Sequence, residues 1–297
     1  MPVVAVINRK GGSGKSTLAT HLAGHCARNG LRVMLGDVDR QQSSLSWLRR
    51  RASQPQAEAA SIVGWAVDPR SVMRPPAGVT HVVLDTPGGL RGFDLARVVM
   101  SADAILIPVC DAAFDRESAA ACLEELMTLP RVATGRCKVA MVGMRVDART
   151  KGAARLAAWA EGLGVPFLGS VRETQVYVRS AEQGLTLFDL PAAKVEGDLA
   201  QWRPIVDWVE ATWQGAERLQ TKAKGALETP SAHSAEAVSK SRTPVPAAPN
   251  AAPAHARMPA RAPAAMPTVD LRAFVSPLPR RPAAGLGWLF SVFRSST

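Results

Sequence analysis

The amino-acid sequence predicts an α/β protein in which helices cover both faces of a parallel β-sheet. Short apolar runs rich in Val, Ile and Leu alternate along the chain with stretches whose apolar residues recur at helical spacing. The first run leads directly into a glycine-rich loop and then a helix, which is the arrangement of a phosphate-binding loop. Strands that are apolar on both faces belong to parallel sheets enclosed between two helical layers.

The expected strands and helices follow one another in regular order. Strands are predicted at residues 3–7, 33–37, 62–66, 81–85, 104–109, 139–142 and 167–171. Helices are predicted at residues 15–29, after residue 44, at 91–101, 115–128 and 151–162, and finally at 194–213. Asn29 and Gly30 supply a stop for the first helix, and the last helix is expected to bend before Pro204.

The glycine-rich loop has the residues needed to hold a phosphate chain. Glycines at 11, 12 and 14 allow the backbone to curl, so that several N–H groups point at one spot. The following helix N-terminus adds partial positive charge, Lys15 is placed to reach the β- and γ-phosphates, and the Ser16 hydroxyl is a ligand for Mg²⁺. A turn with a chance Gly-Lys-Ser is the other interpretation, which the position between a strand and a helix disfavours.

The spacing of this loop is not that of an ordinary Walker A motif, because Arg9 stands where the first glycine would be. Residues 10–17, Lys-Gly-Gly-Ser-Gly-Lys-Ser-Thr, instead resemble the deviant Walker A loop of the ParA/MinD family of P-loop ATPases. The resemblance implies that Lys10 reaches the nucleotide of a second subunit, so that the ATP-bound protein is a sandwich homodimer. It covers roughly residues 1–213, with 142–150 and 171–189 similar to later family segments.

Three aspartates follow predicted strands, at the edge of the sheet where the loop also lies. Asp85 closes its strand as a Walker B aspartate does, and is expected to hold the Mg²⁺ hydration shell beside a γ-phosphate switch at residues 86–89. Asp37 and Asp39 resemble the D-x-D-P-Q segment of the family, which implies that Asp39 positions the attacking water. Arg40 replaces the proline of that segment, and a helix N-cap is the other interpretation of Asp39.

The resemblance implies a complete set of site residues. The implied catalytic residues are Lys10, Lys15 and Asp39, and the implied metal ligands are Ser16 and Asp85. The implied ATP-binding residues are Lys10, Gly11, Gly12, Ser13, Gly14, Lys15, Ser16, Thr17, Asp37 and Asp85. No guanine-reading Asn-Lys-x-Asp or Thr-Lys-x-Asp follows a late strand, which favours ATP. Hydrolysis is expected to be slow without a stimulating partner.

The net charge and the cysteine content limit which partners and which cellular compartment the sequence favours. Residues 222–297 hold ten Lys and Arg against three Asp and Glu, a net +7 out of +11, which leaves +4 for the preceding residues. A mildly basic domain fits weak, salt-sensitive DNA binding. The four cysteines show no C-x-x-C pair, and neither a signal peptide nor a spanning apolar run is recognised. The expected location is the cytoplasm, with association to the nucleoid or the membrane surface.

A change in composition predicts the domain organisation. We expect an ATPase domain at 1–215, a disordered basic linker rich in Pro and Ala at 222–280, and a short amphipathic segment at 284–297. In that last segment Leu286, Leu289, Phe290 and Phe293 share one helical face. A membrane-surface anchor, a hook for a partner groove and a tail that packs on its own domain are its three interpretations.

Three functions remain open at this point. The resemblance favours a ParA-type ATPase that partitions DNA or positions another cargo through ATP-switched, nonspecific DNA binding, together with a ParB-like activating adaptor. A MinD-like membrane-cycling ATPase and a small-molecule amidotransferase-type ligase are the alternatives. The candidate DNA contacts are Arg49, Arg50, Arg51, Arg149, Lys151, Arg172 and Arg179.

Overall fold

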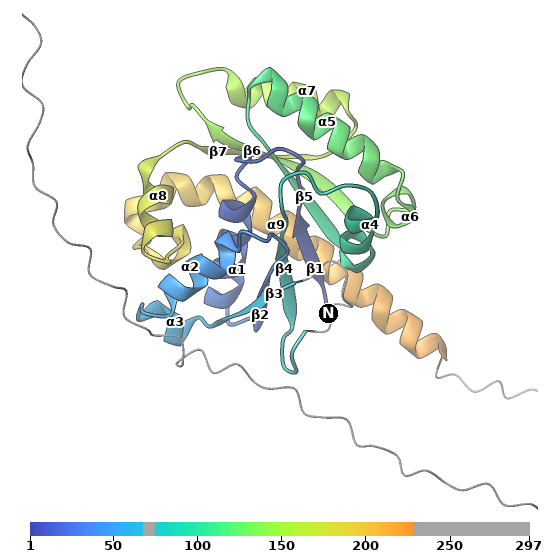
Figure 1. Cartoon of the computed structure of the whole chain (residues 1–297), viewed down its shortest axis with the longest axis horizontal. Coiled ribbons are helices and arrows are strands. Elements are labelled where there is room, and N and C mark those ends of the chain that lie inside the picture. Colours follow the sequence, from blue (N-terminus) through green and yellow to red (C-terminus); the bar gives the residue numbers. More distant parts are fainter. Residues whose placement is uncertain (68–74, 228–297) are drawn as a thin grey trace, which may run out of the picture. The chain divides into compact units, whose positions relative to one another are not determined.

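The computed structural model describes residues 1–67 and 75–227, and within them seven parallel strands form one sheet (Figure 1). The strands are β1 (Val3–Val6), β2 (Val33–Asp37), β3 (Ile62–Ala66), β4 (His81–Asp85), β5 (Ala104–Val109), β6 (Lys138–Val146) and β7 (Phe167–Arg172). Their spatial order is β3-β2-β4-β1-β5-β6-β7. The parallel sheet with helices on both faces is therefore confirmed.

Helices connect the strands and close the chain after β7. They are α1 (Lys15–Arg28), α2 (Ser43–Arg51), α3 (Gln56–Ala59), α4 (Gly92–Ser101), α5 (Ala113–Met127), α6 (Pro130–Ala133), α7 (Gly152–Gly162), α8 (Gln175–Glu182), the 3₁₀ turn η1 (Leu187–Asp189) and α9 (Ala192–Leu227). The spatial order of the strands places β1 at the centre of the sheet. Helix α1 covers one face of the sheet and α4 covers the other.

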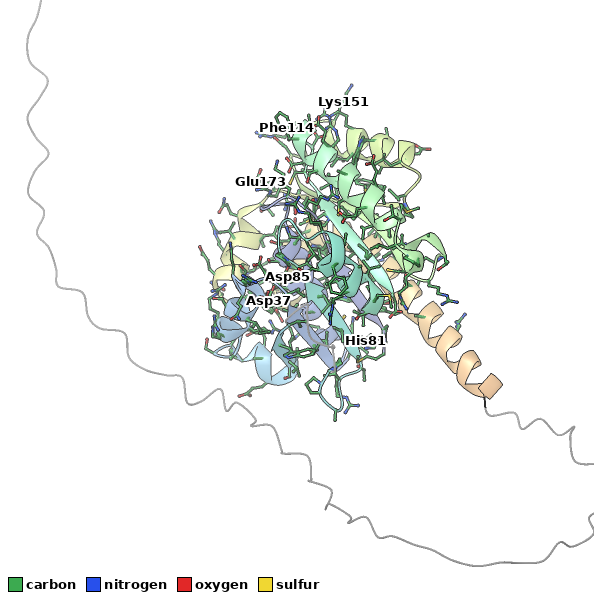
Figure 2. All side chains as sticks on the ribbon, turned by 45° about the vertical axis from the view of Figure 1, so that its right-hand side comes forward. Asp37, His81, Asp85, Phe114, Lys151 and Glu173 are labelled. Carbon is green, nitrogen blue, oxygen red and sulfur yellow. The ribbon has the colours of Figure 1, made fainter. Side chains whose placement is uncertain are left out.

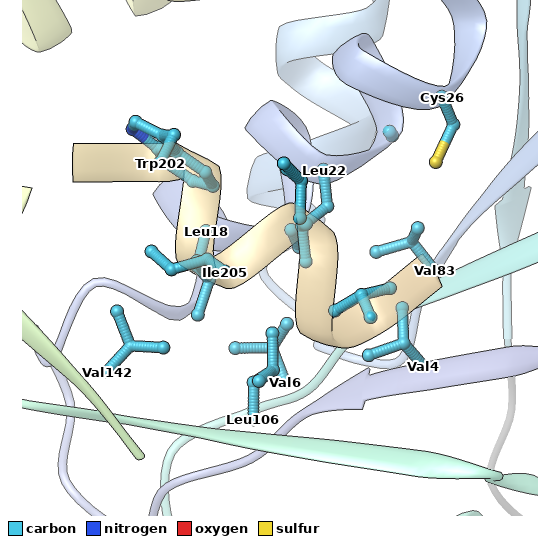
Figure 3. Close-up of a cluster of buried hydrophobic side chains, with 14 of the residues drawn as sticks. Val4, Val6, Leu18, Leu22, Cys26, Val83, Leu106, Val142, Trp202 and Ile205 are labelled. Atoms are coloured by element: carbon cyan, nitrogen blue, oxygen red, sulfur yellow. The ribbon is translucent and has the colours of Figure 1, made fainter. Parts of the chain in front are cut away.

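Two apolar cores lie on the two faces of the sheet, and alternate residues of each central strand enter one or the other. Val4 and Val6 of β1 belong to the core under α1 and α9, which Figure 3 shows with Leu18 and Trp202. Val3, Ala5 and Ile7 belong to the core under α4, α5 and α7. All four residues of β1 are buried, because both faces of the strand are covered.

The ends of α1 follow from its sequence. Gly14 precedes it with φ 95°, a left-handed conformation that glycine adopts without steric cost. At the other end Gly30 N–H donates to the Ala27 carbonyl and Leu31 N–H to the Cys26 carbonyl, both within 3.1 Å. These bonds satisfy the last carbonyls of the helix, so the predicted stop at Asn29 and Gly30 is confirmed.

The last helix differs from its prediction. It continues to Leu227 instead of ending at 213, past the domain boundary that the composition suggests at 215. The expected bend before Pro204 is not where the backbone departs from helical angles, because Val195 has φ −134° and ψ 19° while Pro204 lies inside the helix. The linker is predicted from residue 222, but residues 222–227 are helical and belong to α9. The rest of the predicted linker, residues 228–280, and the segment 284–297 lie outside the described residues.

The four cysteines are all free and buried. Cys26 and Cys110 lie in the core under α1 and α9, and Cys122 and Cys137 lie in the core under α4, α5 and α7. Burial raises the pKa of the thiols of Cys26 and Cys137 to about 12. Among the helices that the structure describes, none combines the length and the hydropathy needed to cross a bilayer.

Candidate nucleotide-binding site

The loop that follows β1 is held in place by a buried asparagine. Asn8 is 1% exposed; its Nδ2 donates to the Pro108 carbonyl at 2.6 Å and its Oδ1 accepts from Lys10 N–H at 3.0 Å. One side chain therefore ties the start of the loop to the end of β5. The sequence analysis missed Asn8, although a polar residue directly after a buried strand is a usable signal.

The glycines of the loop leave room for a ligand on one side only. A Cβ atom on Gly11 or Gly12 would meet nothing within 4 Å, whereas a Cβ on Gly14 would lie 2.9 Å from Met144 Cε. Gly12 and Gly14 also have positive φ angles of 72° and 95°. The backbone is thus packed against the protein at Gly14 and open at Gly11 and Gly12, as a phosphate cradle requires.

Lys15 lies under this loop and close to two of the three predicted aspartates. Its side chain is buried, and its Nζ donates to the Lys10 carbonyl at 2.9 Å. Burial lowers the pKa of Lys15, while the attraction of Asp85 and Asp39 opposes that shift. The first turn of α1 contains no acidic residue and its N-cap is Gly14, so no capping side chain bonds the free N–H groups at this end of the helix.

Asp85, at the end of β4, is buried with one oxygen unused. Its Oδ2 accepts a hydrogen bond from Ser44 Oγ at 2.6 Å, and its Oδ1 has no partner with hydrogen-bond geometry among the described residues. Burial raises the pKa of Asp85 to about 6, against the opposing effect of the Ser44 hydrogen bond and the weaker effect of the nearby Ser16 hydroxyl. A buried carboxylate oxygen without a partner beside Ser16 suits a hydrated cation.

Asp37 and Asp39 have different positions, although both follow β2. Asp37 is buried beside Asp85 (Figure 2), and its two oxygens accept backbone N–H groups of Asp39, Ser44 and Leu45 at 3.0, 2.9 and 3.2 Å. Asp37 therefore satisfies the first turn of α2, the role that one interpretation gave to Asp39. The carboxylate of Asp39 accepts from Gln41 N–H at 2.9 Å and is half-buried.

The predicted switch at residues 86–89 lies directly against the phosphate loop. Thr86 Oγ1 donates to the Val6 carbonyl at 2.7 Å, and Gly89 N–H donates to the Arg9 carbonyl at 2.6 Å. A Cβ on Gly88 would lie 3.2 Å from the backbone nitrogen of Gly11. This contact brings two loops that are far apart in sequence close enough to respond to the same phosphate.

Two clefts of about 570 Å³ each lie in this region, one bordering the loop and the other between β2 and the switch. One begins at Gly14 and Thr17 and continues along Arg145 and Tyr177, on the side of β6, β7 and α8. The other is bordered by Asp39, on the side of β2 and the switch. A nucleotide whose phosphates lie on the loop has space for its base in the first cleft.

The residues present fit Mg²⁺ and a nucleoside triphosphate. Within residues 1–67 and 75–227, no three His, Cys, Asp or Glu side chains gather into a metal site. Mg²⁺ does not need such a cage, since it keeps several waters and takes its other ligands from one or two protein oxygens and the phosphates. The unused oxygen of Asp85 and the hydroxyl of Ser16 are two such protein oxygens.

A parallel sheet with a phosphate loop after its central strand and an aspartate at the end of the adjacent strand defines a P-loop nucleotide-binding protein. The chain belongs to the CobQ/CobB/MinD/ParA nucleotide-binding domain family, whose family model matches residues 4–187. The predicted family resemblance is therefore confirmed. The relatives of the chain include "Protein ParA" of Rhizobium radiobacter, to which it is 30% identical over 115 residues, an alignment covering 39% of this chain and 51% of that protein.

Two of these relatives share a name. The chain is 31% identical over 216 residues to "Maintenance of carboxysome distribution protein A" of Gloeobacter kilaueensis, an alignment covering 71% of this chain and 95% of the relative. It is 28% identical over 191 residues to the protein of that name from Halothiobacillus neapolitanus, which covers 64% and 88%.

Solved structures support the same fold at lower identity. An ATP complex of a McdA variant from Cyanothece superposes with a TM-score of 0.53 at 16% identity, covering 71% of this chain and 96% of that one. The MinC:MinD complex of Aquifex aeolicus gives a TM-score of 0.51 at 16% identity, covering 71% and 95%. The fold is therefore that of the MinD and ParA proteins.

The structure brings most of the predicted site residues together and adds others. Lys15, Ser16 and Asp85 form one cluster with Asp39 at its border, whereas Lys10 turns away from it toward α5. Arg51, a candidate DNA contact, is 2% exposed and pairs with Asp189 at 2.7 Å, so that prediction is wrong. The residues that sequence analysis missed in and around the site are Asn8, Ser44, Asp115, Glu125 and Met144.

Proposed function

We propose that this protein is an ATPase of the ParA type, which dimerises when it binds ATP and Mg²⁺ and positions a DNA or protein cargo through ATP-dependent, nonspecific DNA binding. The observation that carries the proposal is the cluster around Lys15. A buried ammonium, an open glycine cradle and a carboxylate with one unused oxygen converge on one point. Such a cluster suits a triphosphate with its cation, and it has no evident structural role of its own.

Each residue of the cluster has a distinct role in this proposal. Lys15 and the loop amides bind the phosphates, and Ser16 and Asp85 hold Mg²⁺, which neutralises the charge of the phosphates. Asp37 supports the site by fixing the start of α2 rather than by contacting the ligand. Asp39, at the border of the second cleft, aligns the attacking water. Lys10 acts on the nucleotide of the second subunit.

Slow hydrolysis follows from the same geometry. Lys10, Lys15 and the positioned water leave part of the γ-phosphate charge without a stabilising donor. An activating adaptor is therefore expected to accelerate the reaction. Hydrolysis then acts as a timer for release of the dimer from DNA. The hydrogen bonds from Thr86 to the Val6 carbonyl and from Gly89 to the Arg9 carbonyl connect the switch to β1 and to the start of the phosphate loop. They provide a route from the γ-phosphate to the surface.

The DNA surface is proposed on α2 and α8. Arg49, Arg50 and Arg179 are exposed, and Arg50 Nε donates to the Ala181 carbonyl at 3.2 Å, which ties the two helices together. Arg149 and Arg172 are weaker candidates because each is paired with an aspartate of its own chain, Asp147 and Asp198. A cluster of a few unpaired cations suits weak binding to phosphate backbones.

The test is ATP-dependent binding of the full chain to nonspecific double-stranded DNA and, in parallel, to anionic liposomes at fixed salt. Wild type is compared with Lys15→Ala and Asp39→Ala. Lys138→Ala is the control, because Lys138 is an exposed lysine at the amino end of β6, the opposite end of the sheet. We expect DNA binding that needs ATP, is lost in Lys15→Ala and persists in Asp39→Ala.

Other outcomes would redirect or end the proposal. Liposome binding with the same pattern of variants would move the function to a membrane-cycling ATPase of the MinD type. Loss of binding in the Lys138→Ala control would mean that general charge, not the nucleotide site, controls binding. If ATP produces neither a dimer nor binding to either surface, the proposal fails.

The proposed DNA surface has its own test. The Arg49→Gln, Arg179→Gln double variant is expected to bind DNA more weakly and to reduce the slope of log affinity against log salt by about one for each charge removed, which is about four for a dimer that contacts DNA with both subunits. ATP hydrolysis without DNA is expected to stay at the wild-type rate, since neither side chain lines the nucleotide clefts. An unchanged salt slope would exclude this surface.

A further inference from the structure

Lys10 is held by its own subunit in this structure. Its Nζ lies 2.8 Å from Oδ2 of Asp115, in the first turn of α5. The preceding residue of that turn, Phe114, is labelled in Figure 2. The side chain of Asp115 is 10% exposed, whereas the side chain of Lys10 is 42% exposed. The carboxylate is therefore a fixed point of the fold, and the ammonium that it binds is accessible from outside.

The backbone of Lys10 is fixed by the same group of contacts. Its N–H donates to Asn8 Oδ1, which also accepts from Ser118 Oγ of α5 at 3.4 Å, and its carbonyl accepts from Lys15 Nζ at 2.9 Å. Helix α5 thus sets the position of Lys10, and the carbonyl of Lys10 in turn accepts a hydrogen bond from the ammonium of Lys15. Lys10 thus has an ion pair with its own subunit, and Lys15 has a backbone hydrogen bond.

The proposed dimer requires a different arrangement. In the proposed dimer the ammonium of Lys10 turns outward to the phosphates of the second subunit and leaves the buried carboxylate of its own subunit. The Lys10–Asp115 ion pair, which we call the latch, must therefore open in both subunits whenever the dimer forms. Opening has a cost, because the pair is partly buried and the carboxylate loses its nearest cation.

We infer that Asp115 is a positioning residue that retains Lys10 within the free subunit and thereby raises the nucleotide and protein concentration needed for dimerisation. The inference rests on the proposed function, since it assumes an ATP-bound dimer in which Lys10 crosses between subunits. It gives α5 a role that neither the sequence motifs nor the phosphate loop indicate. Asp115 acts on the equilibrium between monomer and dimer and touches no reacting atom.

The test measures the dimer dissociation constant of the full chain by sedimentation equilibrium, with a slowly hydrolysed ATP analogue and Mg²⁺. Asp115→Asn removes the charge at nearly constant volume, and Glu117→Gln makes the same charge change at an exposed position of α5. An ion pair of this exposure is worth about fivefold per subunit, and a dimer opens two, so we expect Asp115→Asn to dimerise about 25-fold more tightly. The control is expected to stay within about twofold of wild type.

Two further readouts separate the latch from a structural effect. The advantage of Asp115→Asn is expected to shrink as salt is added, because salt screens the ion pair of the wild type. Asp115→Glu, which keeps the charge, is expected to restore dimerisation close to the wild-type level. Binding of a fluorescent ATP analogue to the monomer and the melting temperature are measured for each variant.

The outcomes are distinguishable. If wild type binds nucleotide and never dimerises, the proposed function fails and the latch with it. If wild type dimerises, and Asp115→Asn dimerises equally or more weakly while it still melts and binds nucleotide as wild type does, the latch alone is overturned. Tighter dimerisation of Glu117→Gln to the same extent would also overturn it, since net charge would then explain the effect.

Discussion

Acidification is expected to destabilise the folded protein through His21, a residue of α1 that is 1% exposed. Its Nδ1 donates to the Thr17 carbonyl at 2.9 Å, and its Nε2 is buried without a partner among the described residues. The ring is stacked on Trp202, with centroids 5.1 Å apart and planes at 16°. A second proton would add a charge where no acceptor receives it.

The sign and the size follow from the pKa. Burial lowers the pKa of His21 to about 4 from 6.5, and the Thr17 carbonyl and Asp189 only partly oppose it. Between these values the unfolded chain binds a proton that the folded chain does not, so stability is complete above about pH 6.5 and is lost as the pH falls toward 4. The expected loss between about pH 7.5 and pH 5 is about 2 kcal/mol.

The assay is urea denaturation of wild type and His21→Phe at several pH values, followed by tryptophan fluorescence. A comparison is needed because Asp85, whose pKa burial raises to about 6, contributes with the opposite sign in this range. The phenylalanine keeps a ring against Trp202 and cannot be protonated. The stability of wild type relative to the variant is expected to fall by about 2 kcal/mol on acidification. A difference that stays constant within about 0.5 kcal/mol would refute the reasoning.

Three further predictions concern packing. Arg51→Met is expected to lower the free energy of unfolding by about 3 to 5 kcal/mol in urea denaturation, because Asp189 remains buried without its cation; a loss under about 1 kcal/mol would contradict a strong pair. Gly184→Ala is expected to lower the melting temperature and the soluble yield, since Gly184 has a φ of 72° and an added Cβ would lie 2.2 Å from the backbone nitrogen of Arg51. A melting temperature of the Gly184→Ala variant equal to that of wild type would show that the loop at Gly184 and the end of α2 separate easily. Trp202→Ala is expected to cost about 3 to 5 kcal/mol in the same urea assay, as a fully buried ring that donates to Tyr177 Oη is removed. Trp202→Phe should cost clearly less, and equal losses would point to the hydrogen bond rather than to packing.

Much of the fold could be predicted from the sequence because its signals are local. Strands β2, β4 and β5 have the bounds that the apolar runs suggest, since a strand buried on both faces leaves a continuous apolar record. β3 also has its predicted bounds, although it lies at the edge of the sheet and none of its residues is fully buried. β6 is longer than its apolar core at 139–142, because it continues through Gly143 and Arg145. Arg145 has a φ of 53°, which its position in an extended segment does not suggest.

The candidate site was predictable to the extent that it depends on topology. Parallel strands place their carboxyl ends together, so a loop after β1 and an aspartate after β4 had to meet. Which groups then hold each other was not predictable, because the partners are distant in sequence. Lys10 and Asp115 are 105 residues apart, and no periodicity or spacing connects them. The helix-capping role of Asp37 rather than Asp39 likewise depends on the path of the chain between them.

The burial of all four cysteines has a practical consequence for thiol chemistry. A single cysteine introduced at an exposed position becomes the one fast-reacting thiol of the whole chain, so a fluorophore is attached without removal of the native residues. The native thiols react only when the surrounding layer opens. Because Cys26 lies on one face of the sheet and Cys122 on the other, their alkylation rates in dilute denaturant report the opening of each helical layer separately.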